Sequence, residues 1–425
     1  MPLPFLYHTL ENGPPEWVPD WASDPWTVFQ VGAVAGTLYL LKRYCSGALS
    51  LADRNMHGRV VLITGGTSGI GAAVVRDLAM RGAQIILLTH LPPSNPFLAD
   101  FIGEMRQETN NHMIYAEHVD LASLHSVRQF ATKWIDNAPP RRIDMIILCA
   151  ATITPPGKKR VETEEGIEEM WMVNYLANFH LLGILSPAIR AQPFDRDVRI
   201  ILTTCSSYIR SPSLNDALVK KEWSPGKAYA RSKLALMVFG QAFQKHLDTY
   251  KRPDQFPMNS RVIFVDPGYS RTPGMRRWLT RGTIWGLVVY VITYLLSWFF
   301  LKSPDMGAQS ILCAAMDPDL GRGAGGRLIK ECIEVDYARV DVRDEGVAKK
   351  LWEASDKLIE KVEKEQAALR VLEKKRQDLK EKEKKEAEKG EEVNALIDSI
   401  KKGKEAEKKT SRRKGKKASA SAPAS

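Results

Sequence analysis

Short apolar runs alternate with helical patterns through the middle of this 425-residue chain. Each run is four to seven residues long and carries little charge, which is typical of strands buried on both faces of a sheet. Helical stretches separate consecutive runs, and this alternation predicts crossovers between parallel strands, with helices covering both sides of the sheet. The predicted strands are Val60–Thr64, Gln84–Leu88, Met113–Glu117, Asp144–Cys149, Arg199–Thr203, Arg261–Asp266 and a weaker Arg327–Lys330. The pattern therefore predicts an α/β fold with a doubly wound parallel sheet.

Two longer apolar runs fall outside this alternation. Residues 26–41 carry no charge and are followed by Lys42 and Arg43, so we expect a membrane anchor helix over 26–43, or else a buried or interfacial helix. The run at 284–301 lies between the sixth and seventh strands, where a full crossing would split the sheet across the bilayer. We expect it to form an apolar lobe that contacts the membrane. A true span, or a lobe buried within the protein or a dimer, is the alternative.

The C-terminal part is charged throughout. Apolar residues recur at heptad spacing in Leu351, Leu358, Leu372 and Leu379, which predicts a charged helix over 345–402, either a short coiled coil or a solvated single helix. Residues 403–425 hold eight Lys or Arg and two Glu, so more than half of the net charge of +11 lies in this tail. We expect the tail to be disordered and do not expect nucleic-acid binding.

These features predict five regions in order. They are an N-terminal segment at 1–25, the anchor at 26–43, the α/β domain at 56–337 including the lobe at 284–301, the charged helix at 345–402 and the basic tail at 403–425. The five cysteines are scattered and show neither a paired spacing nor a Cys/His cluster. We therefore expect no metal site and a reducing, cytosol-facing compartment.

A glycine-rich loop joins the first predicted strand to a helical pattern. In such a loop glycines permit the tight turn, the close approach of a pyrophosphate to the backbone, and the packing of the helix against the sheet. The strand-to-helix context makes this a Rossmann-type dinucleotide site. The expected cofactor-binding residues of the loop are Gly65, Thr67, Ser68, Gly69, Ile70 and Gly71.

The adenosine side of the cofactor is read at the end of the second strand. An acidic residue there binds the ribose 2′-hydroxyl and repels a 2′-phosphate, but this strand ends in Thr89 and His90. We therefore expect NADP, with NAD as the alternative. Asp120 and Leu121 follow the third strand, where Asp120 either holds the adenine edge or caps the helix that begins near Ser123.

Tyr229 and Lys233 lie four residues apart on one predicted helix face. A phenol with a pKa near 10 is a weak acid or base at neutral pH, and a nearby ammonium group would lower that pKa. The fifth strand ends just before Ser207, whose hydroxyl could donate to a substrate oxygen. Asn174, on an apolar helix, could hold a water in a proton relay.

The segment from about Val60 to Cys332 resembles the short-chain dehydrogenase/reductase family. The resemblance rests on five motifs in order, namely TGxxxGxG (Thr64 to Gly71), an Asn (Asn174), a Ser (Ser207), YxxxK (Tyr229 and Lys233) and PGxxxT (Pro267, Gly268 and Thr272). It implies that Tyr229 is the general acid/base, that Ser207 orients the substrate and that Asn174 supports the proton relay. It further implies that Lys233 binds the cofactor ribose, that Pro267, Gly268 and Thr272 close over the nicotinamide, and that Ala150 contacts the cofactor.

Two positions depart from the family pattern. Cys149-Ala150-Ala151 stands where the family has Asn-Ala-Gly, and the second strand lacks the Arg typical of NADP-using relatives. The long insert between Ser207 and Tyr229 and the sequence Tyr-x-x-Ser-Lys-Leu-Ala are similar to the branch of retinol dehydrogenases and protochlorophyllide reductases.

The resemblance implies hydride transfer between NADP(H) and the alcohol or carbonyl of a hydrophobic, retinoid-, steroid- or lipid-like molecule. The alternative is a membrane scaffold with weak catalysis that acts through its helical, basic tail. Expected partners are this small molecule and membrane lipid, and a homo-oligomer is left open. Because Lys42 and Arg43 follow the anchor, we expect the catalytic domain to face the cytosol, at the endoplasmic reticulum or a lipid droplet.

Overall fold

The computed structural model describes residues 24–137, 141–214 and 223–418. The chain divides into two compact units, Met1–Ile359 and Glu360–Ser425. Most of the predicted N-terminal segment, residues 1–23, and the last seven residues of the predicted tail lie outside the described residues.

An eight-stranded sheet forms the centre of the first unit, with strand order β3-β2-β1-β4-β5-β6-β7-β8. The first seven strands are parallel, and each predicted strand is present within one residue or so of its predicted ends. The sequence prediction missed β8, which pairs antiparallel with β7 and is only three residues long, too short to give a period. The strands are β1 Val60–Thr64, β2 Gln84–Thr89, β3 Ile114–His118, β4 Met145–Leu148, β5 Val198–Thr203, β6 Ser260–Asp266, β7 Arg327–Lys330 and β8 Ile333–Val335.

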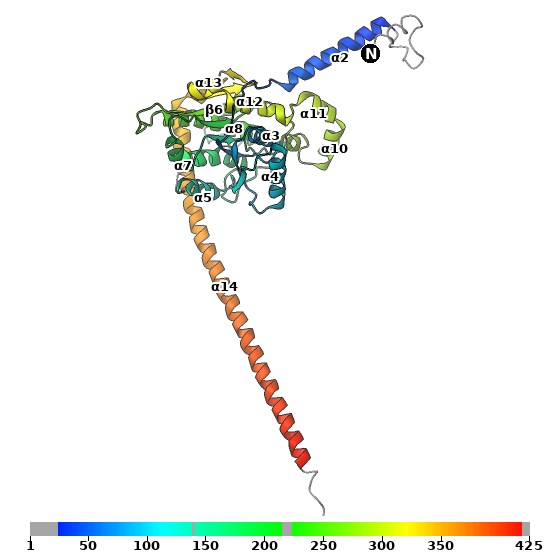
Figure 1. The fold of residues 1–425 in the computed structure, drawn as a ribbon, viewed down its shortest axis with the longest axis vertical. Coiled ribbons are helices and arrows are strands. Elements are labelled where there is room, and N and C mark those ends of the chain that lie inside the picture. Colours follow the sequence, from blue (N-terminus) through cyan, green and yellow to red (C-terminus); the bar gives the residue numbers. More distant parts are fainter. Residues whose placement is uncertain (1–23, 138–140, 215–222, 419–425) are drawn as a thin grey trace, which may run out of the picture. The chain divides into compact units, whose positions relative to one another are not determined.

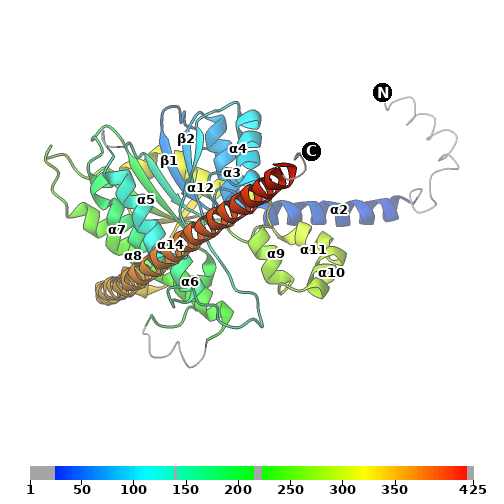
Figure 2. The same cartoon turned by 90° about the horizontal axis from the view of Figure 1, so that it is seen from below.

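Helices cover both faces of the sheet (Figures 1 and 2). One face carries α3 (Gly69–Met80), α4 (Pro96–Thr109) and α12 (Pro304–Met316). The other carries α5 (Leu124–Ile135), α7 (Ala177–Arg190) and α8 (Pro225–Asp248). The core is continuous between layers, because fully buried residues of β1 and β2 such as Ile63 and Leu87 cluster with Val75 of α3 and Ile311 of α12. The shorter helical elements are α6 Glu169–Trp171, η2 Met172–Leu176, η3 Ser206–Arg210, α13 Pro318–Arg322 and η5 Val340–Arg343.

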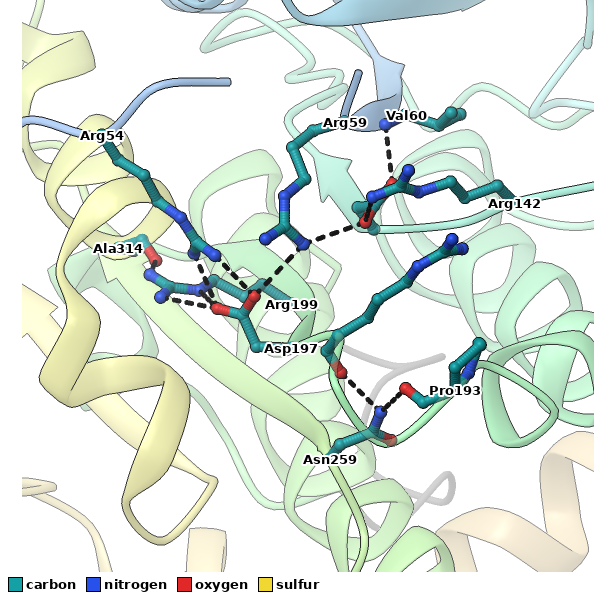
Figure 3. Close-up of polar contacts among 11 residues, drawn as sticks. Arg54, Arg59, Val60, Arg142, Pro193, Asp197, Arg199, Asn259 and Ala314 are labelled. Carbon is teal, nitrogen blue, oxygen red and sulfur yellow. Dashed lines mark hydrogen bonds and ion pairs between the residues drawn. The ribbon is translucent and has the colours of Figure 1, made fainter. Parts of the chain in front are cut away.

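A charged network holds the amino-terminal edge of the sheet (Figure 3). Asp197, just before β5, accepts hydrogen bonds from Arg54 at 2.7 and 2.8 Å and from Arg199 at 2.9 and 3.0 Å. Burial alone would raise the pKa of Asp197, but these bonds and charges hold it well below its usual range. Asp144, just before β4, accepts from the Val60 amide at 2.9 Å. These contacts fix the starts of β1, β4 and β5 relative to one another.

Helix α14 runs from Glu345 to Ala418, so it begins within the first unit and continues through the second. In the first unit the Trp352 ring packs against Phe179 and Phe239, with centroids 5.2 and 5.6 Å apart, and Ser355 Oγ lies 2.7 Å from the Tyr175 hydroxyl. The start of the charged helix therefore packs as part of the α/β domain. The helix also includes residues 403–418, for which the sequence predicts disorder. Ala, Lys, Glu and Arg, which dominate there, are good helix formers.

The first long apolar run forms α2 (Pro25–Ser46), which Asp24 caps by accepting from the Trp26 and Thr27 amides. By length and hydropathy, one helical stretch in the described part of the chain could cross a membrane. It is Glu169–Arg190, which consists of α6, η2 and α7, and 72% of its apolar window is buried in the protein. That helix is a core element rather than an anchor. Helix α2 does not reach the same hydropathy, although most of its apolar side chains are exposed.

The second long apolar run is broken. It forms α10 (Ile284–Ile292) and α11 (Tyr294–Phe300), which meet at Thr293 and follow α9 (Pro273–Leu279). Crossing a bilayer takes roughly 20 helical residues, so neither helix is long enough. No residue of α10 or α11 is buried, and the exposed side chains include Ile284, Trp285 and Leu295. Lys42 of α2 donates to the Trp298 carbonyl at 2.5 Å, so α2 and α11 are in contact.

Candidate active site

The glycine loop leaves β1 at Thr64 and enters α3 at Gly69. A Cβ at Gly71 would lie 2.1 Å from the Gly65 carbonyl oxygen, and one at Gly65 would lie 2.8 Å from the backbone of Ala150. Gly65 also has a φ of +68°, which disfavours other residues. Glycine is therefore required at both positions for the loop to fold tightly against β1 and the end of β4.

The first turn of α3 can receive an anion. Ser68 is the N-cap residue, is exposed, and makes no side-chain capping bond, so the first amides of the helix are not capped by it. Helix N-termini offer free N–H groups and a positive dipole end to a phosphate. Thr67 and Ile70 flank this turn and are half-buried. The loop therefore has the tight turn and the helix N-terminus that binding of a dinucleotide pyrophosphate requires.

The carboxyl end of β2 is close to that of β3. Thr89 is buried, and its carbonyl accepts from the Val119 amide at 2.8 Å, whereas His90 is exposed. Asp120 Oδ1 accepts from the Ala122 amide at 2.8 Å, and the residue that caps α5 is Ser123. The alternative interpretation of Asp120 as the helix cap is therefore wrong. Its carboxylate shapes the turn that also carries Leu121.

The turn after β6 closes against the glycine loop. The Gly268 amide donates to Asp266 Oδ1 at 3.0 Å, and Thr272 caps α9 by accepting from the Met275 amide at 3.2 Å. A Cβ added at Gly69 would meet the Thr272 side chain at 3.1 Å. Pro267 is buried. The two cofactor loops predicted from sequence are thus brought into contact, although 200 residues separate them.

Tyr229 and Lys233 lie on α8, which begins after the N-cap Ser224. Lys233 is 3% exposed, and its Nζ donates to the Thr203 carbonyl at the end of β5 at 3.0 Å. The same Nζ lies 5.7 Å from the centroid of the Tyr229 ring. The ammonium group therefore ties α8 to the carboxyl edge of the sheet and holds the phenol beside it.

Asn174 lies in the π-helical turn η2, and its side chain is fully buried. Its Oδ1 accepts from the Thr152 amide at 2.8 Å, and its Nδ2 donates to the Thr152 carbonyl at 3.0 Å and to Ser232 Oγ at 3.1 Å. Ser232 Oγ in turn donates to the Tyr229 carbonyl at 2.9 Å. Asn174 thus links the chain that follows β4 to the turn of α8 carrying Tyr229.

Ser207 lies in η3, immediately after the end of β5. Its Oγ is 2.7 Å from the Cys205 Sγ. Ser206 turns the other way, toward the Asp266 carboxylate and Lys330, whose Nζ donates to Ser206 Oγ at 3.1 Å. The side chains of Cys205 and Ser207 therefore contact each other, whereas that of Ser206 faces Asp266 and Lys330.

Electrostatics at this edge are dominated by burial. Burial raises the pKa of Tyr229 well above its usual range, and contact with the Cys205 thiol and the charge of Asp266 act in the same direction. Burial also lowers the pKa of Lys233 and raises that of Cys149 to about 11. The sequence argument expects Lys233 to lower the pKa of Tyr229, but the opposite direction prevails. A phenol whose pKa lies near or above 10 is protonated at neutral pH, so Tyr229 can donate a proton.

Sequence reasoning missed the cysteines of this edge. Cys149 ends the β4 region and Cys205 ends the extended part of β5, and both influence the Lys233 charge. Their positions directly after two neighbouring parallel strands were the available signal, because such ends meet at one edge. The general preference of cysteine for buried, inert positions obscured it.

Comparisons with known proteins agree with this architecture. A family model for short chain dehydrogenases matches residues 59–281, more than half of the chain. The uncharacterized oxidoreductase pbr1 of Schizosaccharomyces pombe is 40% identical over 86% of this chain and 97% of its own length. A solved structure of an uncharacterized protein from Mycobacterium paratuberculosis covers 74% of this chain and 98% of its own, with a TM-score of 0.54 and 23% identity, and shows the fold alone.

Two further relatives carry specific names. Polyprenol dehydrogenase of Mus musculus is 31% identical over 76% of this chain and 91% of its own length. Retinol dehydrogenase 13 of Homo sapiens is 29% identical over 77% of this chain and 93% of its own length. The chain belongs to the short-chain dehydrogenase/reductase family of oxidoreductases, which use a nicotinamide cofactor. Within that family it lies in the branch similar to retinol dehydrogenases.

Proposed function

We propose that this protein transfers hydride between NADP(H) and the alcohol or carbonyl of a hydrophobic small molecule. The observation that carries the proposal is the position of Tyr229 and Lys233. Lys233 binds the end of β5 at 3.0 Å, at the same sheet edge as the glycine loop. A proton donor, a fixed cation and a dinucleotide cradle at one edge form the set that carbonyl reduction needs.

Each of these residues has a distinct part in the chemistry. A bound nicotinamide would supply or accept the hydride. In reduction, the protonated Tyr229 phenol donates its proton to the oxygen on which negative charge develops, and in oxidation it accepts that proton back. Lys233 holds the phenol in place and binds the cofactor ribose. Asn174, through Ser232, fixes the turn of α8 that carries the phenol. The hydrogen-bonding group for the substrate oxygen comes from the segment after β5, where Ser207 Oγ and Cys205 Sγ lie 2.7 Å apart.

The cofactor is proposed to be NADP because no carboxylate stands at the end of β2. Thr89 and His90 offer a hydroxyl and an imidazole, with Ser68 exposed at the start of α3. None of these side chains repels a 2′-phosphate. The glycine cradle fits either nicotinamide dinucleotide, so the preference rests on this end of β2.

The hydrophobic substrate class is supported by the apolar surfaces beside the site. Helix α9 begins directly after Thr272, and α10 and α11 follow it with exposed apolar side chains. The relatives named retinol dehydrogenase and polyprenol dehydrogenase bear names of apolar alcohols. A retinoid-, steroid- or lipid-like alcohol or carbonyl is therefore the proposed substrate, delivered from a membrane.

Membrane attachment is proposed through α2 and the α10–α11 lobe together. Helix α2 exposes Trp26, Phe29 and Leu40, and Lys42 joins it to α11. Arg276, Arg277 and Arg281 precede the lobe and suit an anionic lipid surface. The proposed location is the endoplasmic reticulum or a lipid droplet, with the catalytic domain in the cytosol.

The direct test measures NADPH and NADH consumption by the purified full-length protein against retinoid, steroid and fatty aldehydes and ketones. We expect NADPH consumption with at least one apolar carbonyl and none with small polar carbonyls of the same reactivity. The Tyr229→Phe protein, assayed in parallel, separates this turnover from contaminating reductases. A wild-type protein that binds NADPH but reduces no member of the panel would remove the proposal.

A further inference from the structure

The last extended residue of the β5 segment is Cys205, not a serine. Strand β5 ends at Thr203, yet Cys205 still has φ −160° and ψ 158°, and the chain turns into η3 only at Ser206. Side chains alternate along an extended chain, so Cys205 projects from the same face as Thr203. The Thr203 carbonyl is the group that Lys233 binds. The Cys205 thiol therefore lies two residues beyond Thr203, at the carboxyl edge of the sheet.

The side-chain contacts give the order of the groups. The Cys205 Sγ lies 2.7 Å from Ser207 Oγ, and interaction with the same thiol raises the pKa of Tyr229. Cys205 also interacts with the charge of Lys233. For Ser207 the partner recorded in the described part of the chain is Cys205 itself. Cys205 thus contacts Ser207, and it lies two residues after Thr203, whose carbonyl binds the Lys233 ammonium beside Tyr229.

We propose that the Cys205 thiol is the catalytic hydrogen-bonding group beside Tyr229 and contacts the substrate oxygen, while Ser207 is a positioning residue that holds the thiol. A thiol is a weak donor, but a soft, polarizable one that tolerates an apolar neighbour. Cys205 is a free, half-buried cysteine, so part of the residue is exposed. The proposal rests on the proposed reductase function, and deepens it by assigning the substrate-orienting role to a different side chain from the one that the sequence predicts.

Single substitutions distinguish the roles of Cys205 and Ser207. Cys205→Ala removes the donor and should lower kcat at least about tenfold, with the NADPH Kd unchanged. Loss of one strong donor to a developing oxyanion lowers kcat by about a hundredfold or more, and a thiol is a weaker donor. Cys205→Ser restores a donor of similar shape and should recover kcat to the wild-type level or above it. Ser207→Ala should lower kcat only a few-fold. Cys45→Ser, on α2, controls for loss of a thiol elsewhere.

The comparison of the two alanine variants decides the assignment. A larger loss of kcat in Cys205→Ala than in Ser207→Ala supports the proposal, and rescue by Cys205→Ser separates hydrogen bonding from packing. An equal or larger loss in Ser207→Ala overturns it. Wild-type turnover in the same assay shows that the proposed function stands in either case, so the two failures are distinguishable.

A second measurement does not need turnover. All five cysteines are free, so iodoacetamide labelling of the full chain can be followed by peptide mass spectrometry at each thiol. If Cys205 contacts the phenol, Tyr229→Phe should change the labelling rate of Cys205 by at least about threefold and leave Cys45 unchanged. An unchanged rate at Cys205 would show that the thiol does not touch Tyr229, and the proposal would fail.

Discussion

At the scale of single residues, Tyr229 is the proposed proton donor, and its ring centroid lies 5.7 Å from the Lys233 ammonium. Burial raises the pKa of the phenol, which is neutral at pH 7 even at its usual pKa. Tyr229→Phe keeps the ring and its packing but removes the proton. We expect kcat to fall at least about a hundredfold, with NADPH affinity and the unfolding midpoint unchanged. Stopped-flow turnover and fluorescence titration check this, and near-normal turnover would exclude Tyr229 from the mechanism.

The end of β2 decides which cofactor is preferred. Replacing Thr89 by Asp puts a carboxylate where a 2′-phosphate would bind, so we expect NADPH to bind more weakly than NADH in Thr89→Asp and more tightly in the wild type. Thr89→Asn is the matched control, because asparagine has the shape of aspartate without its charge. This variant should still bind NADPH more tightly than NADH. Fluorescence titration with both cofactors gives the ratio. A wild-type preference for NADH would contradict the assignment.

At the scale of elements, the loop between β1 and α3 leaves no room for a side chain. A Cβ at Gly71 would lie 2.1 Å from the Gly65 carbonyl oxygen, so Gly71→Ala must open the loop. We expect the Kd for NADPH to rise at least about tenfold, because the amides that cradle the pyrophosphate move. Gly103→Ala, in the middle of α4 with nothing within 4 Å of the new Cβ, is the control and should bind normally. Unchanged binding in Gly71→Ala would show that the cofactor does not use this loop.

The beginning of α14 shows how packing reassigns an element. Its sequence is that of a solvated charged helix, but Trp352 and Ser355 fit against α7 and α8 through Phe179, Phe239 and Tyr175. Heptad spacing is a local property and says only that a helix has an apolar seam. What that seam packs against depends on residues more than 100 positions away, which no local pattern specifies.

At the scale of the whole molecule, membrane attachment should depend on two surfaces. Deleting residues 1–43 removes most of α2 but leaves the exposed apolar side chains of α10 and α11. We therefore expect the shortened protein to bind liposomes more weakly than the full chain but still to sediment with them. Replacing Trp285, Ile292 and Leu295 by Ser in the shortened protein should release it. A shortened protein that is fully soluble would show that the lobe does not bind membrane.

The orientation of the chain in the membrane is tested by protease protection in sealed microsomes. Protease added to sealed microsomes should digest both the catalytic domain and the helix beyond Val347, because both are proposed to lie in the cytosol. Protection of that helix while residues just after Arg43 are cut would mean that the 284–301 run crosses the bilayer. The break at Thr293 argues against such a crossing.

The sequence by itself determined the seven parallel strands, the glycine loop and the order of the motifs. These are local properties: a buried strand needs an unbroken apolar run, and the turn after β1 needs glycine whatever surrounds it. The tertiary structure alone decided that Cys205 and Ser207 contact each other while Ser206 faces Asp266, and in which direction the pKa of Tyr229 moves. It also decided that Ser123, rather than Asp120, caps α5. Each of these outcomes depends on burial and on contacts between distant segments, which arise only when the sheet and its helices are packed together.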